Sequence, residues 1–255
     1  MERWLLIAST LFALIAAVQG IATVQRGNRS RMTLAWMILV ICLQSAFLAL
    51  RGDLREACPL ADFGEILAYL AWSLTLFYLL VGPTYRISLL GVFTAPVVVV
   101  FQAVALIPGV MDADPQAIGS SGPWGETHSA TSVLSYGAYA LAAVAGVMFL
   151  ILDKQLKAQH LKSSLFKNLP PVRELITSLT RLLWIGNALL TLGIIAGLLM
   201  PKPDGLNSHF WVAIAVWAAY LALLIIKQVR GMTGRRLSRF AVLFFLLSLG
   251  VFAFI

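Results

Sequence analysis

Long runs of apolar residues alternate with short polar stretches along the whole chain. Each run holds roughly 16 to 25 residues, and about 20 apolar residues in a helix cross a hydrocarbon layer about 30 Å thick. Because lipid offers the backbone no hydrogen-bond partner, each run is predicted to be a helix. The pattern therefore predicts an all-α fold, a polytopic membrane helix bundle that forms a single integral membrane domain over residues 1–255. The eight predicted transmembrane helices are residues 4–24, 33–50, 64–82, 87–110, 128–152, 176–200, 210–226 and 237–255.

The composition agrees with a membrane protein. Hydrophobic residues make up 60% of the 255 residues, charged residues make up 12%, and the mean hydropathy is +0.89. Soluble domains carry about 25% charged residues, so this composition excludes a soluble globular protein. The first run is uncharged and its arginines follow it, so we predict a retained helix there and not a cleaved secretory signal.

The distribution of charge predicts the orientation of the bundle. Most of the 19 lysines and arginines fall in alternate loops, at residues 26–31, 86, 154–173 and 227–239. Positively charged loops stay on the cytoplasmic side of a membrane. Both termini are therefore predicted to face outward (N-out/C-out), together with the loops around Asp53, Asp112 and Asp204. The net charge of +8 reflects this topology, and no nucleic-acid partner is expected.

The two longest loops differ in character. The outer loop at 111–127 has no lysine or arginine and several glycines, which is typical of an irregular surface cap. The inner loop at 153–174 is basic and ends in Pro170 and Pro171, so we expect a helical extension that stops before the next helix begins. Its charge is interpreted as a topology signal, with contact to anionic lipid as the alternative.

Several kinds of chemistry lack their usual residues. The only cysteines are Cys42, within a predicted span, and Cys58, in an outer loop, so neither a CxxC pair nor a disulfide between them is expected. The chain has no Walker-type loop, no GxGxxG and no HExxH, which argues against nucleotide hydrolysis and zinc proteolysis. No catalytic residue is predicted, and direct catalysis is left open.

Two of the three histidines are predicted to lie at one depth. His160 falls in the basic inner loop, whereas His128 and His209 each come just before a span at the outer surface. A neutral imidazole at a helix end can ligate a metal or haem iron. We therefore single out His128 as a candidate metal ligand.

The helix that begins at His128 carries a polar stripe. His128, Ser132, Ser135 and Tyr139 step by four, three and four residues, so they share one helix face. In a membrane such a face turns toward other helices or a wet cavity. For the serines and Tyr139, the hydroxyls either contribute to a binding site or simply bond to neighbouring helices.

Other polar and small residues inside the spans are interpreted as packing features. Four polar residues are expected to form interhelical hydrogen bonds: Gln44, Gln102, Arg181 and Asn187. A seam of small residues on the sixth span is expected to allow close helix packing: Gly186, Gly193 and Gly197.

Three segments in the second half of the chain carry recognisable motifs. The first segment begins with the stretch from His128 to Tyr139 and ends with LDKQLK at 152–157. The second joins LPPVR at 169–173 to LLTLGIIAG at 189–197, and the third joins WAAY at 217–220 to RGMTGRR at 230–236. In order and spacing, these segments resemble the cytochrome c assembly family of the CcsA/HemX type over residues 125–255.

The resemblance implies a multi-pass protein of the bacterial inner membrane that takes part in cytochrome c biogenesis. Members of that family handle haem at the periplasmic face, where haem is joined to the CxxCH thiols of apocytochrome c. The resemblance implies that His128 is an outer axial haem ligand and that aromatic rings cover the haem faces. Haem, apocytochrome c, other cytochrome c maturation membrane proteins and the lipid bilayer are the expected partners.

The chain also departs from the family pattern. The tryptophan-rich WGxxWxWD motif is replaced by PKPDGLNSHFW at 201–211, and no second outer histidine follows the last span before Ile255. Gln44 and Lys227 stand near positions where the family carries histidines inside the membrane. These departures place the chain nearer the shorter, HemX-like branch.

Two residues could compensate for the missing ligands. His209 is either a replacement second ligand or an interfacial residue, and Trp124 is either a haem-stacking platform or an interfacial anchor. The candidate cofactor-binding residues are His128, His209, Trp124, Ser132 and Tyr139.

Three functions follow from the sequence. The first is a haem-handling factor of cytochrome c biogenesis, and the second is a non-haem accessory or regulatory membrane protein that modulates a haem-synthesis or assembly partner. A small-molecule transporter is the third, but neither clear internal repeats nor paired helix breaks support it.

Overall fold

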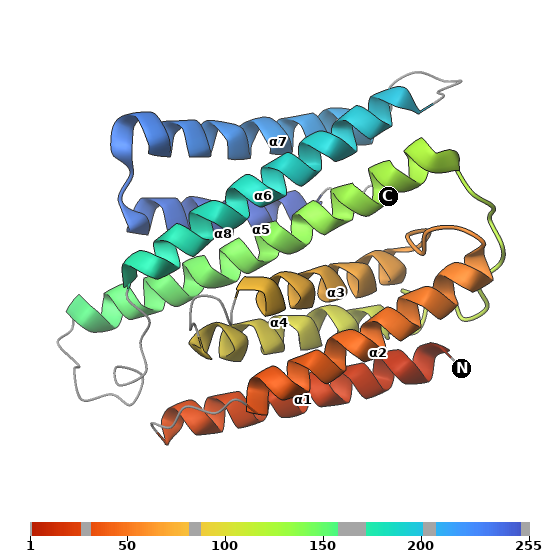
Figure 1. Cartoon of the computed structure of the whole chain (residues 1–255), viewed down its shortest axis with the longest axis horizontal. Helices are drawn as coiled ribbons and strands as arrows, with labels where there is room; N and C mark the ends of the chain where they lie inside the picture. Colours follow the sequence, from red (N-terminus) through yellow and green to blue (C-terminus); the bar gives the residue numbers. More distant parts are fainter. Residues whose placement is uncertain (1, 27–31, 82–87, 158–171, 201–207, 251–255) are drawn as a thin grey trace.

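The structure is a computed structural model in which helices form a single bundle (Figure 1). It describes residues 2–26, 32–81, 88–157, 172–200 and 208–250, and the side chains of residues 88, 172, 208 and 209 lie outside that description. Apart from one isolated bridge between Pro108 and Met111, these residues contain no β-strand, which confirms the predicted all-α fold. The elements are α1 (Glu2–Gln25), α2 (Met32–Arg55), α3 (Phe63–Val81), α4 (Ser88–Ala105), α5 (Gly122–Lys157), α6 (Val172–Leu199), α7 (Ser208–Ile226), the π-helical turn η2 (Lys227–Gly231) and α8 (Gly234–Leu249).

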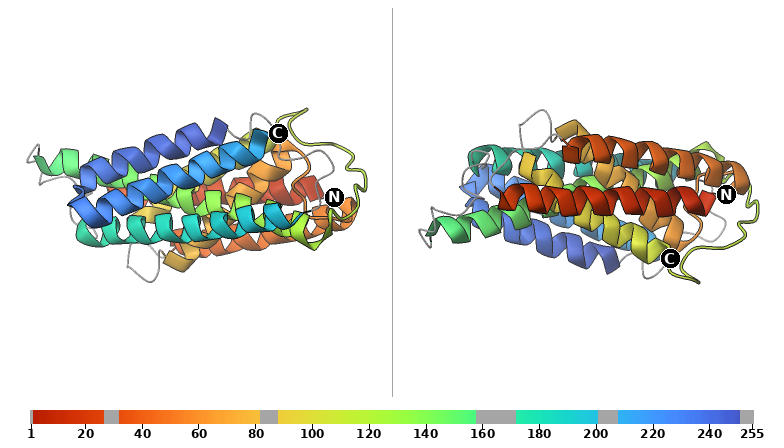
Figure 2. Two further views of the ribbon diagram at one scale, coloured as in Figure 1. Left: turned by 90° about the horizontal axis from the view of Figure 1, so that it is seen from above. Right: turned by 90° about the horizontal axis from the view of Figure 1, so that it is seen from below.

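Helix α5 lies at the centre of the bundle, and the other helices run alongside it (Figures 1 and 2). It packs against α6 and α8 of the second half and against α3 and α4 of the first half. Within the most apolar window of α5, 78% of the residues are buried, compared with 22% for α7. The central helix thus joins the two halves and carries most of its residues away from lipid.

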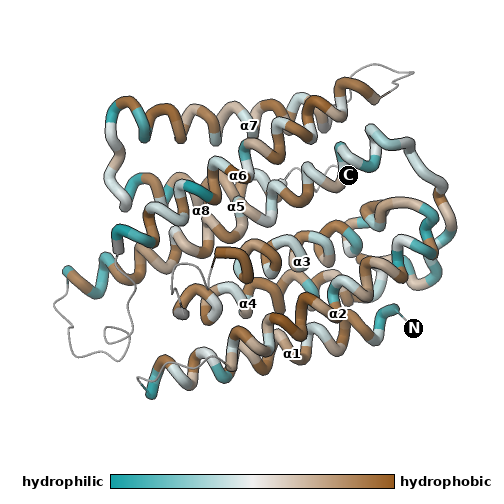
Figure 3. The backbone as a smooth tube through the Cα atoms, in the orientation of Figure 1, coloured by the Kyte–Doolittle hydropathy of each residue, from teal (hydrophilic) through white to brown (hydrophobic). Residues whose placement is uncertain are grey.

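Within the described residues, six helices are long and apolar enough to cross a membrane: α1, α2, α3, α5, α6 and α7. Helix α4 is apolar but shorter, and α8 has 16 residues. Hydrophobic residues dominate the middle of the helices, and hydrophilic residues gather toward both ends of the bundle (Figure 3). The predicted polytopic membrane bundle is confirmed.

The start of α1 and the end of α8 lie toward the same end of the bundle (Figure 2). The helix ends nearest the two termini are therefore on one side of the bundle, and residues 1 and 251–255 lie outside the described residues. We call this end, which also holds Arg55 and Gly122, the outer end. The opposite end, which holds Lys157 and Lys227, is called the inner end. Which end faces the cytoplasm remains a prediction from the charge distribution.

At the outer end of the bundle, helices α2 and α5 extend well beyond their predicted bounds. Helix α2 continues to Arg55 because Arg51 and Arg55 are buried and ion-paired there. Helix α5 begins at Gly122, whose φ of 81° suits glycine, and Pro123 fits the first turn of a helix. The expected irregular cap is therefore wrong for residues 122–127, and His128 lies in the second turn of α5 instead of just before the span.

The inner loop also begins as predicted. Helix α5 continues past the predicted span end at 152 as far as Lys157, which confirms a helical extension there. The rest of the loop, with His160, Pro170 and Pro171, lies outside the described residues.

The four polar residues inside the spans differ in burial and in hydrogen bonding. Gln102 Nε2 on α4 donates to Ser9 Oγ on α1 at 2.8 Å, and Asn187 Oδ1 on α6 accepts from Tyr139 of α5, so both make the predicted interhelical bonds. Gln44 is 1% exposed, and neither its amide nitrogen nor its amide oxygen has a hydrogen-bond partner among the described residues. Arg181 is exposed on α6.

Candidate functional site

His128 is partly buried in the second turn of α5 and contacts α6. Its Nδ1 lies 2.7 Å from the backbone oxygen of Gly193. A carbonyl oxygen can only accept a hydrogen bond, so Nδ1 carries the proton and donates. In the neutral ring, Nε2 then keeps a free lone pair. Histidines that ligate metals usually have this arrangement, in which one ring nitrogen donates to a carbonyl and the other binds the metal.

The glycine seam of α6 packs against the polar stripe of α5. A Cβ atom at Gly197 would lie 2.7 Å from His128 Nδ1, and one at Gly193 would lie 2.6 Å from Ser132 Oγ. Such distances are below normal contact, so only glycine allows α5 and α6 to approach this closely. The predicted close packing along the seam is confirmed. Of the two neighbours predicted for the stripe, other helices or a wet cavity, the structure shows a helix at these positions.

Tyr139 lies deeper along the same face and is fully buried. Its ring stacks on that of Tyr220 from α7, with centroids 3.8 Å apart and planes at 7°. Its hydroxyl donates to Asn187 Oδ1 at 3.3 Å. The Tyr139 hydroxyl therefore bonds a neighbouring helix, and the ring packs among α5, α6 and α7.

The two serines of the stripe differ. Ser135 Oγ donates to the carbonyl oxygen of Ser132 within α5 at 2.6 Å. Ser132 Oγ is buried and has no hydrogen-bond partner in the part of the chain that the structure describes. Ser132 lies one helical turn from His128 and faces Gly193 of α6.

Trp124 and His209 complete the predicted set. Trp124 lies one turn before His128 on α5, and 49% of its surface is exposed. His209 is in the first turn of α7, and the starts of α5 and α7 lie toward the same end of the bundle (Figure 1), but the His209 side chain lies outside the described residues. The structure thus brings Trp124, His128 and Ser132 together on neighbouring turns.

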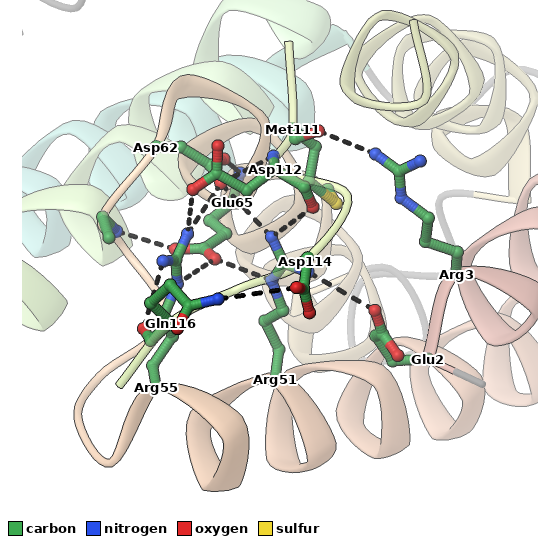
Figure 4. A network of polar contacts seen from close by, with 11 residues as sticks. Glu2, Arg3, Arg51, Arg55, Asp62, Glu65, Met111, Asp112, Asp114 and Gln116 are labelled. Carbon is green, nitrogen blue, oxygen red and sulfur yellow. Dashed lines mark hydrogen bonds and ion pairs between the residues drawn. The ribbon is translucent and has the colours of Figure 1, made fainter. Parts of the chain in front are cut away.

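A second cluster, which sequence reasoning missed, lies at the outer end of the first half (Figure 4). Arg51 has a fully buried side chain, and its Nε donates to Glu65 Oε1 at 2.7 Å. Arg55 Nε donates to the same oxygen at 2.8 Å, and Arg55 Nη2 donates to Asp112 Oδ2 at 2.7 Å. Asp62 Oδ2 accepts from both arginines, at 3.3 and 3.1 Å. We call these residues the arginine cluster: Arg51, Arg55, Asp62, Glu65 and Asp112.

The arginine cluster fastens the loop between α4 and α5 across the ends of α2 and α3. Arg51 Nη2 donates to the carbonyl oxygen of Asp112 at 2.9 Å, and Arg55 Nη1 donates to that of Gln116 at 3.3 Å. Hydrogen bonding from Arg55 lowers the pKa of the Asp112 carboxyl below its ordinary value. The loop at 111–121 is thus irregular, as predicted, but held in place by ionic contacts.

A local sequence signal for this cluster does exist. Asp62 and Glu65 have the spacing of a capping box, and Glu65 N donates to Asp62 Oδ1 while Ala61 N donates to Glu65 Oε2, both at 2.7 Å. Arg51 and Arg55 have the spacing of one helical turn. These two patterns indicate helix ends, but they do not reveal that the two pairs meet.

Neither a metal cluster nor a disulfide is seen. Among the described residues, no group of three or more His, Cys, Asp or Glu is arranged to hold a metal ion. Cys42 and Cys58 are both free, in agreement with the prediction. Burial raises the pKa of the Cys58 thiol to about 11, with nearby Glu126 and Glu65 adding to the effect. Cys58 is therefore protonated and weakly nucleophilic at neutral pH.

The chain is similar to known proteins over most of its length. The Cytochrome C assembly protein family matches residues 60–254, which include α3 to α8. Protein HemX of Brevibacillus brevis is 28% identical over 181 residues, covering 69% of this chain and 65% of that protein. Cytochrome c biogenesis protein CcsA of Gloeobacter violaceus is 22% identical over 297 residues, covering 94% and 86%. The CcsA protein of Synechococcus sp. (strain JA-3-3Ab) is 31% identical over 139 residues, covering 53% of this chain and 40% of that protein.

Proposed function

The chain belongs to the cytochrome c assembly protein family, and from this premise we propose that it is a haem-handling membrane protein of cytochrome c biogenesis. In this proposal it binds or presents haem at the outer, periplasmic face of a bacterial inner membrane. Relatives named as cytochrome c biogenesis proteins support the biological process, and the geometry around His128 supports the cofactor.

The hydrogen bond between His128 and Gly193 is the observation that carries the proposal. It fixes the tautomer of the imidazole, so that Nε2 has its lone pair free for an axial bond to iron. It also fixes the ring against a rigid glycine seam, which reduces the ordering that ligation would require. A histidine that served only as an interfacial residue would not need to pack closely against glycines of the neighbouring helix.

Haem bound here would be held by His128 as one axial ligand, and it would supply the redox-active iron porphyrin that cytochrome c requires. Trp124, one turn away and half exposed, is placed to contact an apolar macrocycle face. His209, at the same end of the bundle, is the candidate second ligand. Apocytochrome c and other cytochrome c maturation membrane proteins are the proposed partners.

Absorption spectroscopy of detergent-purified protein tests the proposal. Protein from haem-replete cells is expected to show a Soret band, and His128→Ala is expected to lose most of it while keeping its thermal unfolding profile. His160→Ala, which removes the histidine of the basic inner loop, is the matched control and should keep the band. A colourless wild-type preparation, or an unchanged band in His128→Ala, would contradict the proposal.

His209→Ala separates the two interpretations of the second histidine. If His209 is the second ligand, its removal changes the iron from six-coordinate to five-coordinate and shifts the Soret maximum. An unchanged spectrum would leave His209 as an interfacial residue and leave the role of His128 intact.

The alternative function is a non-haem accessory or regulatory protein with the same fold. The full burial of Tyr139 and its stacking on Tyr220 favour it, because one of the predicted haem-contacting residues packs the bundle instead. This alternative predicts a co-purifying membrane protein whose recovery is the same for wild type and His128→Ala. A Soret band that depends on His128 would exclude it.

A further inference from the structure

A basic groove lies on the surface of α8 at the inner end of the bundle. It has a volume of about 360 Å³ and is lined by Arg236, Arg239, Phe240 and Leu243. These residues follow one another at i, i+3, i+4 and i+7, so they share one helix face. Both arginines are exposed, and the exposed fractions of Phe240 and Leu243 are 40% and 48%.

The ion pair at the start of α8 involves Arg235 and not the two arginines of the groove. Neighbouring Arg235 donates to Asp153 Oδ2 on α5, and Lys157 also pairs with Asp153. Among the residues that the structure describes, neither Arg236 nor Arg239 has a carboxylate partner. The inner-end segments outside that description, 27–31, 82–87 and 158–171, contain no aspartate or glutamate. An anion that pairs with these arginines would therefore come from outside the chain.

The groove also changes from charged to apolar along α8. Arg236 and Arg239 lie in the first two turns, and Leu243 lies about 10 Å further along the axis, at about 1.5 Å per residue. Beyond it along α8, Leu246 and Leu247 are exposed at 61% and 67%. A molecule that matches this surface has an anionic head followed by an apolar tail.

The start of α8 adds to the positive potential. Thr233 precedes the helix but makes no side-chain capping hydrogen bond. The first backbone N–H groups of α8 therefore have no cap, and they face the same end as the two arginines.

We propose that this groove binds an anionic phospholipid of the inner leaflet, with its phosphate on Arg236 and Arg239 and an acyl chain along Phe240 and Leu243. The assignment to the inner leaflet follows from the positive-inside orientation. Anionic lipids are concentrated on the cytoplasmic side, and basic pockets beside transmembrane helices bind their head groups. The proposal is independent of haem binding, because the groove lies at the opposite end of the bundle from His128.

Native mass spectrometry of the detergent-purified protein, titrated with phosphatidylglycerol, tests the site. Each arginine is expected to contribute about a fivefold gain in affinity, so Arg236→Gln/Arg239→Gln should bind this lipid about 25-fold more weakly than wild type. The matched control is Arg173→Gln/Arg230→Gln, which removes the same charge from exposed positions at the same end and should stay within about twofold of wild type. Equal losses in both double variants would show diffuse surface charge and overturn the proposal.

Two further ligands separate the phospholipid from other occupants. Phosphatidylcholine, which has the same tails and no net charge, and inorganic phosphate, which has no tail, are both expected to bind more weakly than phosphatidylglycerol. Equal binding of inorganic phosphate would overturn the lipid assignment in favour of a simple anion site. Phe240→Ala/Leu243→Ala should weaken phosphatidylglycerol without changing phosphate, and an unchanged lipid affinity would overturn the acyl-chain contact.

A partner protein on this face is the remaining alternative. The lipid proposal would be overturned by two results together. A protein would co-purify with wild type but not with Arg236→Gln/Arg239→Gln, and both forms would bind phosphatidylglycerol equally. Thermal unfolding in a zwitterionic detergent should be the same for all variants, since the substituted side chains are exposed.

Discussion

At the scale of single residues, the arginine cluster is the most demanding feature of the molecule. The side chains of Arg51 and Glu65 are both fully buried, and Arg55 is 4% exposed. Removing such charges from water is costly, and the cost is offset only when each group keeps its partners. The carboxylates of Glu65 and Asp62 each serve both arginines through a single oxygen, but only the Glu65 side chain is fully buried, whereas that of Asp62 is 15% exposed. The cluster therefore depends on Glu65 more than on any of its exposed members.

Glu65→Gln is expected to destabilise the protein by about 3–5 kcal/mol, because it leaves buried arginine charge without its central partner. Glu56→Gln is the matched control, since Glu56 is exposed in the turn that follows α2, and it should change stability by less than about 0.5 kcal/mol. Denaturant unfolding in detergent, followed by fluorescence, measures both. Equal stability of the two variants would mean that the cluster contributes little.

Asp112 gives the cluster a dependence on acid. Arg55 lowers the pKa of Asp112 below the ordinary value of 3.8, so the carboxylate stabilises the folded state above that pH. This contribution is lost as the pH falls through the lowered pKa. As the pH is lowered below about 4, we expect the unfolding temperature of wild type to fall. The difference in unfolding temperature between wild type and Asp112→Asn should shrink over the same pH range. Because the side chain is 57% exposed, the effect is expected to be small.

Asp114→Asn serves as the control for that titration. The carboxylate of Asp114 accepts only a long hydrogen bond, of 3.5 Å, from Gln116 Nε2. The acid dependence of the unfolding temperature is expected to be the same in Asp114→Asn as in wild type, because no ion pair joins Asp114 to the arginine cluster among the described residues. A similar acid dependence in both variants would assign the effect to general surface charge.

At the scale of elements, the pairing of α5 with α6 determines the candidate haem site. The polar stripe of α5 and the glycines of α6 both follow helical periodicity, so their side chains remain in register over several turns. His128 meets Gly193 and Gly197 at the outer end, and Tyr139 meets Gly186 deeper in the bundle. The orientation of the imidazole is therefore a property of the helix pair and not of α5 alone.

Gly197→Ala is expected to move the His128 ring while leaving the bundle folded. The added methyl group would lie 2.7 Å from Nδ1, so the ring must shift and its hydrogen bond to Gly193 must lengthen. Overpacking of this kind costs about 1–3 kcal/mol. We expect a weaker or shifted Soret band, with helical circular dichroism unchanged. Gly250→Ala, where an added Cβ meets nothing within 4 Å, should keep the wild-type spectrum.

At the scale of the whole molecule, the bundle is asymmetric from one end to the other. The outer end holds the arginine cluster and the candidate haem site, and the inner end holds the basic groove of α8. Helix α5 extends through both ends and contacts both halves. The function at each end therefore depends on which side of the membrane that end occupies.

Cysteine labelling in intact cells tests this orientation. In a variant that carries Cys42→Ser and Cys58→Ser, a cysteine introduced by Asp114→Cys is expected to react with a membrane-impermeant maleimide from outside. One introduced by Lys154→Cys should react only after permeabilisation. The two positions are at opposite ends of the bundle, and each lies outside the arginine cluster. The reverse pattern would invert the topology and place both proposed sites on the wrong sides.

How far the sequence alone reaches depends on the distance over which an interaction acts. The apolar runs determined the helices, because their length and composition already satisfy the membrane, and the charge pattern determined the predicted orientation. The polar stripe and the glycine seam could also be predicted, because each repeats at helical spacing within one element. Helix ends were less predictable: α2 ends at Arg55, where contacts with other elements extend the helix, and α5 begins at Gly122, before the predicted span.

Only the tertiary structure decided which of these elements meet. The Arg51 guanidinium finds Glu65 14 residues away and the Asp112 carbonyl 61 residues away, and no local pattern specifies such partners. The proton position of His128 is set by a carbonyl 65 residues further along the chain. Burial and proton location depend on atoms that packing brings together, whereas helix formation in a membrane depends mainly on the neighbouring residues of the same segment.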